Sequence, residues 1–166
     1  GPIARHGMAI MAAREGLSFE SAITSDSAAL PPLVDAMRDA GMDVHVLRDP
    51  TRGGVASALN EIAVASGVGV EIDEAALPVP GDVRAACELL GLDPLYVANE
   101  GVLVAFVPEA QAARALSAMR FHPLGAEAVR IGRVVAEHPR FVVLRTALGG
   151  TRVVDLLPGD QLPRIC

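Results

Sequence analysis

Hydrophobic residues recur along this chain with two spacings, one typical of amphipathic helices and one typical of strands. Five segments show the helical spacing, and a glycine beyond several of them favours a helix end, because glycine readily takes the left-handed conformation found there. The predicted helices cover residues 6–15, 31–40, 55–66, 82–90 and 108–120. Pro31 suits the first turn of its helix. Asp82 suits the N-cap of the helix over 82–90.

Extended segments fill most of the space between these helices. We predict strands over residues 44–47, 68–72, 95–98, 102–107, 129–136, 141–145 and 152–156. The last two flank Leu148-Gly149-Gly150, which is typical of a hairpin turn. Helices that alternate with strands, followed by antiparallel pairs, indicate an α+β fold with a mixed β-sheet covered by helices. Pro158 and Gly159 end the last strand, so we expect one domain over residues 1–157 and a flexible tail over 158–166.

The composition of the chain argues against several classes of function. The chain has 166 residues, of which 51% are hydrophobic but only 3% aromatic, and its net charge is -6. So few aromatic rings and so negative a charge argue against a nucleic acid or an anionic membrane as partner. No apolar run approaches the roughly 18 residues that a membrane-spanning helix needs. We therefore expect a soluble, cytoplasmic protein, and the absence of an initial Met favours a fragment of a longer one.

The two cysteines, Cys87 and Cys166, have none of the spacings that hold a structural zinc ion, so we expect no metal site. Cys87 lies among apolar residues of a predicted helix and is expected to be a buried hydrophobic residue. Cys166 is the last residue of the sequence. A thiol there can enter the pocket of another protein with no following segment in the way, which makes Cys166 a candidate group carrier. The alternative is an incidental cysteine at a frayed end.

A loop rich in turn-forming residues lies between the strand predicted at 44–47 and the helix predicted at 55–66. Free N–H groups at the helix start, with two arginines beside them, favour binding of a phosphate oxygen, and the glycines would let a ligand approach the backbone. The loop lacks the P-loop pattern. In the alternative, Thr51 merely caps the helix and Asp49 pairs with an arginine. The candidate binding residues are Arg48, Asp49, Thr51, Arg52, Gly53 and Gly54.

A turn, Asn99-Glu100-Gly101, joins two of the predicted extended segments. A carboxylate beside an amide on a tight turn suits general acid–base catalysis, because the turn projects both side chains from one rigid place. Glu100 and Asn99 are therefore candidate catalytic residues, although such turns also occur for conformational reasons alone. His6, at the start of the first helix, could face a ligand. The other three histidines are expected to be structural or surface residues.

Taken together, these stretches resemble the HypE family of hydrogenase maturation proteins, within the superfamily of ATP-using enzymes related to aminoimidazole ribonucleotide (AIR) synthetase. The resemblance is carried by residues 1–3, 6–7, 12–17, 48–54, 59–63, 91–101 and 163–166. Pro163-Arg164-Ile165-Cys166 is the most specific stretch, since related synthetases lack it. The resemblance implies an AIR synthase-related C-terminal domain. It covers only the C-terminal part of the family, so the family's N-terminal ATP-binding domain is absent from this sequence.

The resemblance implies part of an ATP-dependent carbamoyl dehydratase, a lyase-type enzyme. In this family a carbamoyl group is loaded onto the terminal cysteine, here Cys166. ATP phosphorylates the oxygen of the resulting thiocarbamate, and departure of phosphate with removal of the N–H protons leaves a thiocyanate, which supplies cyanide for the iron of [NiFe]-hydrogenase. Glu100, with Asn99 beside it, is then expected to transfer protons or to orient the thiocarbamate. His6 and the loop over 48–54 are expected to help to bind ATP.

The same resemblance implies ATP and Mg²⁺ as cofactors, bound mainly by the missing N-terminal domain. The implied partners are the carbamoyltransferase HypF, the HypC-HypD scaffold complex, and a second copy in a homodimer of the full-length protein. The isolated fragment is expected to be inactive, because half of the nucleotide site is missing. Two alternatives stay open: the C-terminal domain of another AIR synthase-related synthetase that acts on a small molecule, and a non-catalytic partner-binding module.

Overall fold

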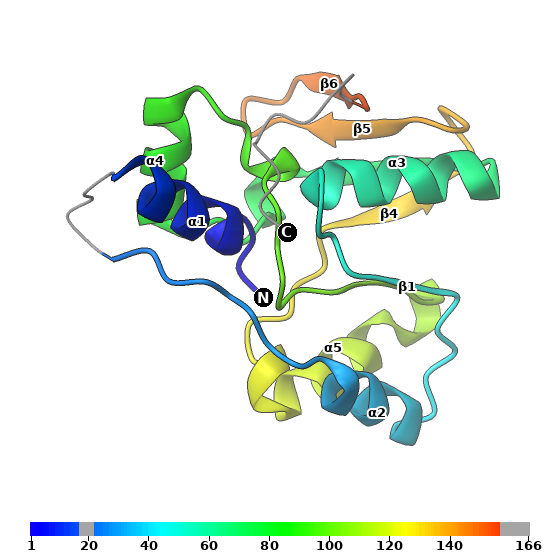
Figure 1. Cartoon of the computed structure of the whole chain (residues 1–166). Coiled ribbons are helices and arrows are strands. Elements are labelled where there is room, and N and C mark those ends of the chain that lie inside the picture. Colours follow the sequence, from blue (N-terminus) through cyan, green and yellow to red (C-terminus); the bar gives the residue numbers. More distant parts are fainter. Residues whose placement is uncertain (17–21, 157–166) are drawn as a thin grey trace.

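The computed structural model describes residues 1–16 and 22–156 (Figure 1). The α-helices in this part of the chain are α1 (Arg5–Glu15), α2 (Pro31–Asp39), α3 (Gly54–Ser66), α4 (Gly81–Leu90) and α5 (Ala112–Phe121). The strands are β1 (Val46–Arg48), β2 (Gly69–Asp73), β3 (Val104–Phe106), β4 (Gly132–Val135), β5 (Val142–Arg145) and β6 (Thr151–Val154). Short 3-10 helices are η1 (Glu74–Ala76), η2 (Pro94–Tyr96), η3 (Glu109–Gln111) and η4 (Pro123–Gly125).

The predicted helices are confirmed, except that the one expected from residue 108 starts with η3 and becomes α5 only at Ala112, and three of the helices end at the glycines that the sequence indicated. Gly16, Gly67 and Gly91 follow α1, α3 and α4 with φ of 62°, 67° and 67°. The prediction that Asp82 is the N-cap of α4 is wrong. The carbonyl of Pro80 accepts the N–H of Arg84 at 2.8 Å, which closes the first turn earlier and makes Pro80 the cap.

The predicted α+β fold with a mixed sheet is confirmed, but the strands divide between two sheets. In the four-stranded sheet the order is β4-β2-β5-β6, where β2 is antiparallel to β4 and parallel to β5. The predicted hairpin joins β5 to β6, and within it the N–H of Thr146 donates to the carbonyl of Gly150. β1 and β3 form a separate antiparallel pair, with Val46 opposite Phe106.

Several of the predicted extended segments differ from the structure, among them the one predicted at 129–136, of which β4 keeps only Gly132–Val135. Residues 95–98 were expected to be extended, but η2 begins there, because the carboxylate of Asp93 accepts the N–H of Leu95 at 3.0 Å and Pro94 fits the first turn. β3 keeps only the middle of the predicted segment over 102–107, and β1 begins two residues later than predicted. Only the residues that pair between β1 and β3 take strand geometry.

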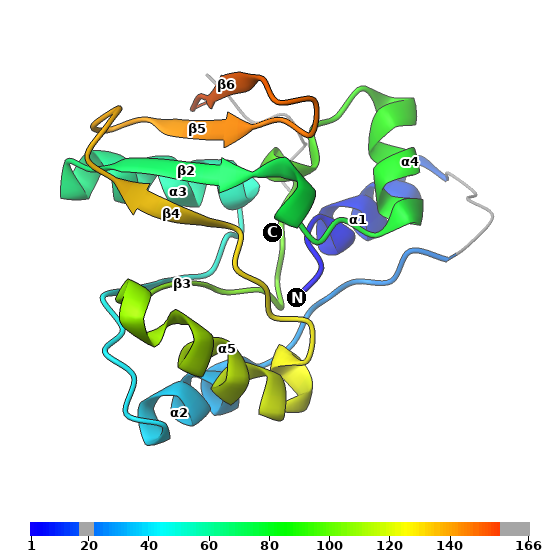
Figure 2. The same cartoon turned by 180° about the vertical axis from the view of Figure 1, so that it is seen from behind.

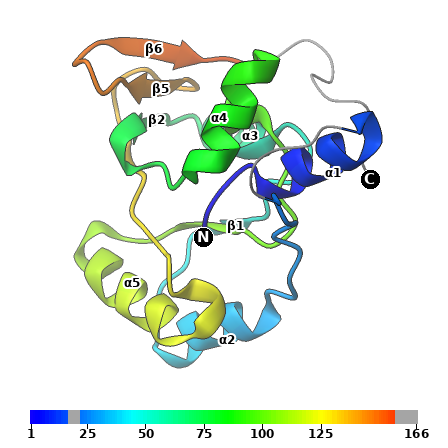
Figure 3. The ribbon, with the colours of Figure 1, turned by 90° about the vertical axis from the view of Figure 1, so that its left-hand side faces the viewer.

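The helices lie around the two sheets in three groups. Figures 1 and 2 show α3 against one face of the four-stranded sheet, and α2 beside α5 next to the two-stranded pair. Figure 3 shows α1 and α4 together on another side of the molecule. The main core joins α3 to the four-stranded sheet, and its buried residues include Val55, Leu59, Ala63, Val70, Ile72, Val142, Leu144 and Val154. A smaller cluster between α1 and α4 contains Met8, Val83, Ala86, Cys87 and Val97.

The end of the described chain is fixed against α3 and η2 by two side chains. The amide of the buried Asn60 donates to the carbonyl of Val154 at 2.8 Å. The hydroxyl of Tyr96 donates to the carbonyl of Asp155, also at 2.8 Å. The chain that leads to residue 156 therefore passes close to η2, three residues before Asn99. Among residues 1–16 and 22–156, no helix is long and apolar enough to cross a membrane.

Candidate functional site

Asn99 connects three separate segments from inside the protein. Its side chain is fully buried, and its Oδ1 accepts the N–H of Ala4 at 2.7 Å. Its Nδ2 donates to the carbonyl of Pro50 at 2.9 Å and to that of Val97 at 3.1 Å. Both of its N–H donors and one acceptor position are therefore used by the backbone. This use of the amide favours a positioning role for Asn99 and corrects the expectation that it projects from the turn together with Glu100.

Glu100 follows Asn99 on the same turn and is half-buried. The N–H groups of Glu100 and Gly101 both donate to Oδ2 of Asp26, at 3.1 and 2.8 Å. The backbone approaches so closely here that a Cβ on Gly101 would lie 1.7 Å from the carbonyl oxygen of Asp26. Glycine is therefore required at 101 by contact between chain segments, and the direction in which residue 100 leaves the backbone is fixed.

The first turn of α1 meets the same region. Nδ1 of His6 lies 2.8 Å from Oγ of Ser25, and the N–H of Gly7 donates to the carbonyl of Ala98 at 3.0 Å. Ala4 precedes the helix with φ of 70°, a left-handed conformation that costs a residue with a Cβ about 1 kcal/mol. The hydrogen bond from Ala4 to Asn99 helps to hold it there.

The loop over 48–54 adjoins the turn, but its glycines serve the fold. A Cβ on Gly54 would lie 2.4 Å from the carbonyl oxygen of Leu95, and one on Gly53 would lie 2.1 Å from Oγ of Ser57. The protein itself therefore occupies the space in which a side chain at either position would lie, and binding of a ligand to the backbone of these two glycines stays a prediction. Both have positive φ, 70° at Gly53 and 61° at Gly54.

One polar residue of this loop, Thr51, does not take the role that the alternative gave it. Gly53 is the N-cap of α3 and no side chain caps the helix, so the alternative role of Thr51 as cap is wrong. Arg48 forms its ion pair with Glu61 of α3 at 2.7 Å, and both side chains are exposed. Asp49 and Arg52 are also exposed. The loop therefore meets the Asn99 turn through Pro50, while Arg48 is held on the α3 side.

We call this meeting point the Asn99 junction and define it as Ala4, His6, Asp26, Pro50 and residues 99–101. It brings together three of the candidate residues, His6, Asn99 and Glu100, and it adds Asp26, which was not among the candidates predicted from the sequence. The available signal was the polar run Thr24-Ser25-Asp26-Ser27, which follows no helical or strand period. Cys166, the predicted carrier, lies outside the described residues. Among residues 1–16 and 22–156, no cluster of three His, Cys, Asp or Glu side chains could hold a metal ion.

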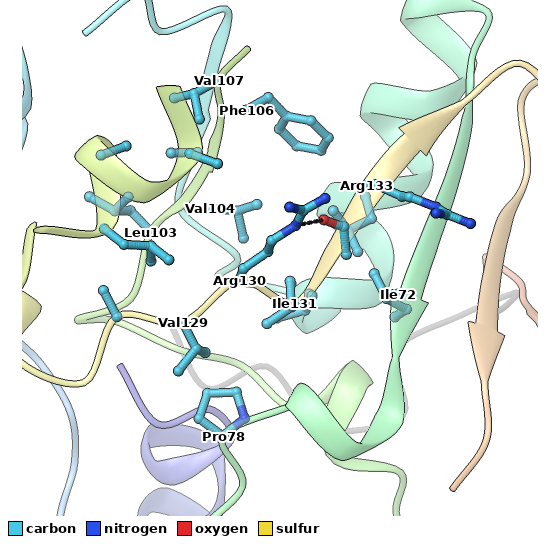
Figure 4. Close-up of a pocket in the computed structure, with 18 of the residues that line it drawn as sticks. Ile72, Pro78, Leu103, Val104, Phe106, Val107, Val129, Arg130, Ile131 and Arg133 are labelled. Atoms are coloured by element: carbon cyan, nitrogen blue, oxygen red, sulfur yellow. Dashed lines mark hydrogen bonds between the residues drawn. The ribbon is translucent and has the colours of Figure 1, made fainter. Parts of the chain in front are cut away.

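A cavity of about 290 Å³ lies between β3, α5 and the segment that enters β4, and it is also lined by Ile3 and Val102, the neighbours of Ala4 and Gly101. Figure 4 shows Val104 and Phe106 on one side of it and Val129 and Ile131 on the other. Arg130 at its edge forms a two-pronged ion pair with Glu109, at 2.6 and 2.7 Å. None of the candidate site residues lines this cavity. Its apolar walls offer little for acid–base chemistry, so it is not the candidate site.

Comparison with known proteins identifies the family of the chain. The family model for "AIR synthase related protein, C-terminal domain" matches residues 1–144. The chain belongs to this family. The resemblance noted from the sequence is confirmed, and so is the fold class that it implied.

The relatives are hydrogenase maturation proteins. The carbamoyl dehydratase HypE of Cupriavidus necator is 60% identical over all of this chain, which covers 47% of that protein. A crystal structure of HypE in complex with ATP matches all of this chain with a TM-score of 0.93 and 46% identity. A HypE-HypF complex matches 95% of it with a TM-score of 0.90 and 45% identity. In both structures this chain covers 51% of the matched chain, so it spans about half the length of its relatives.

Proposed function

We propose that this chain is the C-terminal half of an ATP-dependent carbamoyl dehydratase that makes the cyanide ligand for the iron of [NiFe]-hydrogenase. The observation that carries the proposal is 60% identity, over the whole chain, to a protein named carbamoyl dehydratase HypE. The other half of the protein supplies most of the contacts to ATP and Mg²⁺. An ATP complex of a 46% identical relative supports ATP as substrate.

Cys166 is the proposed carrier of the carbamoyl group. The group arrives on sulfur as S–CO–NH₂, and the sulfur–carbon bond stays intact through the reaction. ATP transfers its terminal phosphoryl group to the thiocarbamate oxygen and leaves as ADP. The carbon–oxygen bond then breaks, its electron pair leaves with phosphate, and two N–H protons are lost as S–C≡N forms. Overall, S–CO–NH₂ and ATP give S–C≡N, ADP, phosphate and a proton.

The point where the described chain ends supports delivery of Cys166 to the Asn99 junction. The carbonyl of Asp155 is bonded to Tyr96 of η2, close in sequence to Asn99. Cys166 is eleven residues beyond Asp155 (166 − 155), and eleven residues span at most roughly 36 Å. That length is enough to reach Glu100 from η2. Sulfur suits the carrier role because it accepts the acyl group and later leaves as thiolate.

Glu100 is the proposed proton-transfer residue of this half of the site. Its backbone is fixed by Asp26, and the preceding residue, Asn99, is held by two other segments, those of Ala4 and Pro50. Such fixing matters because a general base must lie within hydrogen-bond reach of the proton that it removes. The start of α3 and the loop over 48–54 would place partial positive charge near the transferred phosphoryl group.

The proposed partners follow from the same relatives. A HypE-HypF complex has been solved for a 45% identical relative, which supports HypF as the carbamoyltransferase that loads Cys166. We further propose that the thiocyanate is delivered to a HypC-HypD scaffold complex, that the full-length protein forms a homodimer, and that it acts in the cytoplasm.

Intact-protein mass spectrometry tests the function directly. The full-length protein, incubated with its carbamoyltransferase and a carbamoyl donor, is expected to gain one carbamoyl group. Addition of ATP is then expected to remove the mass of one water. A protein that gains the carbamoyl group but never loses water in the presence of ATP would contradict the proposal.

The Glu100→Gln variant separates the two steps in the same assay. We expect it to accept the carbamoyl group normally and to dehydrate it about a hundredfold to ten-thousandfold more slowly, the usual contribution of a general base. Glu88→Gln, at an exposed glutamate of α4 outside the Asn99 junction, is the matched control and is expected to behave as the wild type. Normal thiocyanate formation by Glu100→Gln would remove Glu100 from the mechanism.

A further inference from the structure

Three consecutive side chains in an irregular segment each hold a different residue in or beside the Asn99 junction. Residues 22–30 contain no helix or strand. Within them, Oγ1 of Thr24 accepts from the guanidinium of Arg5 at 2.8 Å, and Oγ of Ser25 lies 2.8 Å from Nδ1 of His6. Asp26 binds the turn that bears Glu100. Figure 1 shows this segment running between α1 and α2.

Asp26 differs from its two neighbours in what it holds. One oxygen, Oδ2, accepts two successive N–H groups, those of Glu100 and Gly101, at 3.1 and 2.8 Å. Hydrogen bonds to a carboxylate are stronger than those between neutral groups. Two of them on adjacent amides fix the backbone on both sides of residue 100. Gly101 completes the arrangement, because any larger residue would collide with the carbonyl of Asp26.

The second oxygen of the same carboxylate is buried without a partner. Oδ1 of Asp26 is shielded from solvent and makes no hydrogen bond within the described residues. A buried polar atom without a partner is costly, and each such group in a folded protein calls for an explanation. Keeping a carboxylate at this position is therefore costly, which supports a role for Asp26 beyond closure of the turn.

We propose that Asp26 is a positioning residue for the dehydration step, holding Glu100 in the orientation needed for proton transfer. The proposal rests on the proposed function. Asp26 acts through the backbone of residues 100–101 and does not itself exchange a proton with the thiocarbamate. A shift of about 1 Å in a reacting group can slow an enzymatic step about a hundredfold, so loss of this contact should mainly affect the chemical step.

The test uses the full-length protein, first loaded with the carbamoyl group, and follows its ATP-dependent loss of water. Asp26→Ala removes both hydrogen bonds and is expected to lower kcat about a hundredfold. Asp26→Asn keeps one oxygen acceptor but loses the negative charge, and it is expected to lower kcat about tenfold. KM for ATP should change less than about twofold in both variants, because the contacts that bind ATP equally in the ground state and the transition state are not affected.

Asp73 provides the matched control. Its side chain also accepts a backbone N–H, that of Ala75 at 3.1 Å, but it lies at the end of β2. Asp73→Ala and Asp73→Asn are expected to keep the wild-type kcat. If Asp26→Ala fails to fold, Asp26→Asn decides the question. A wild-type kcat in Asp26→Asn, or a raised KM with an unchanged kcat, would overturn the proposal.

The outcomes also separate this inference from the proposed function. A wild-type protein that forms no thiocyanate would overturn the proposed function itself, whereas a normal wild type with normal Asp26 variants would overturn only this inference.

Discussion

The N–H of Ala4 donates to Oδ1 of Asn99 over 2.7 Å, although the two residues are 95 positions apart in the sequence. Both residues are completely buried. The same asparagine holds the carbonyl of Pro50, so one amide joins the start of the chain, the loop before α3 and the turn of Glu100. The position of Glu100 therefore depends on long-range contacts as well as on its own turn.

Replacement of Asn99 should destabilise the fold as well as the site. Asn99→Ala leaves the N–H of Ala4 and the carbonyl of Pro50 without partners, and each unsatisfied buried group costs about 1–3 kcal/mol. We expect the free energy of unfolding to fall by about 3 kcal/mol in urea denaturation. Asn99→Asp should lower the free energy of unfolding further, because a carboxylate oxygen would face the carbonyls of Pro50 and Val97.

Ser117→Ala, at an exposed position of α5, is the control for Asn99→Ala and should change the free energy of unfolding by less than about 0.5 kcal/mol. An equally small loss in Asn99→Ala would contradict the structural role.

Gly54 should tolerate alanine much less well than Gly67 does. Both have positive φ, 61° and 67°, so alanine at either position costs about 1 kcal/mol of backbone strain. At Gly67 a Cβ meets nothing within 4 Å, whereas at Gly54 it would lie 2.4 Å from the carbonyl of Leu95. We expect Gly54→Ala to lose about 2 kcal/mol more than Gly67→Ala in the same denaturation experiment. Equal losses would show that the close approach is absent.

The two cysteines should differ in reactivity. Burial, followed by the negative charge of Asp93, raises the pKa of the Cys87 thiol from 9.0 to about 11. We expect native protein at pH 8 to titrate with one thiol, that of Cys166, and unfolded protein with two. Cys87→Ser and Cys166→Ser variants assign the signals. Two reactive thiols in the native protein, or a native thiol that persists in Cys166→Ser, would contradict this.

The same raised pKa predicts how stability changes in alkaline solution. Between pH 9 and about 11 the unfolded chain releases the Cys87 proton while the folded chain keeps it. The unfolded state then binds fewer protons, so the free energy of unfolding should fall as pH rises through this window. Cys87→Ala should lose this part of the pH dependence, which denaturant titrations at pH 8, 9.5 and 11 would measure. An unchanged slope in the variant would contradict the assignment to Cys87.

Local signals in the sequence predicted much of the fold. Glycine has a low cost in the left-handed conformation, so Gly16, Gly67 and Gly91 identify helix ends. The hairpin between β5 and β6 follows from its glycine-rich turn. Local signals failed where a neighbouring residue changed the backbone conformation of the segment. Asp93 and Pro94 begin a 3-10 turn in a segment whose apolar residues favoured a strand.

The candidate site was predicted less completely because long-range contacts build it. The motif around Glu100 is visible in the sequence, but nothing local shows that Asp26 binds its backbone across 74 positions. Gly54, in the loop before α3, has a signal for close approach, but the sequence does not reveal that the approaching group is the carbonyl of Leu95. The division of the strands into two sheets likewise depends on pairing between distant segments.

The most direct test of the account is the mass of the peptide that contains Cys166. The peptide would be isolated from full-length protein in cells that make active hydrogenase, with a Cys166→Ser strain in parallel. The account predicts a thiocarbamate or thiocyanate on Cys166, and no hydrogenase activity in the Cys166→Ser strain. An unmodified Cys166, together with active hydrogenase in the Cys166→Ser strain, would contradict it.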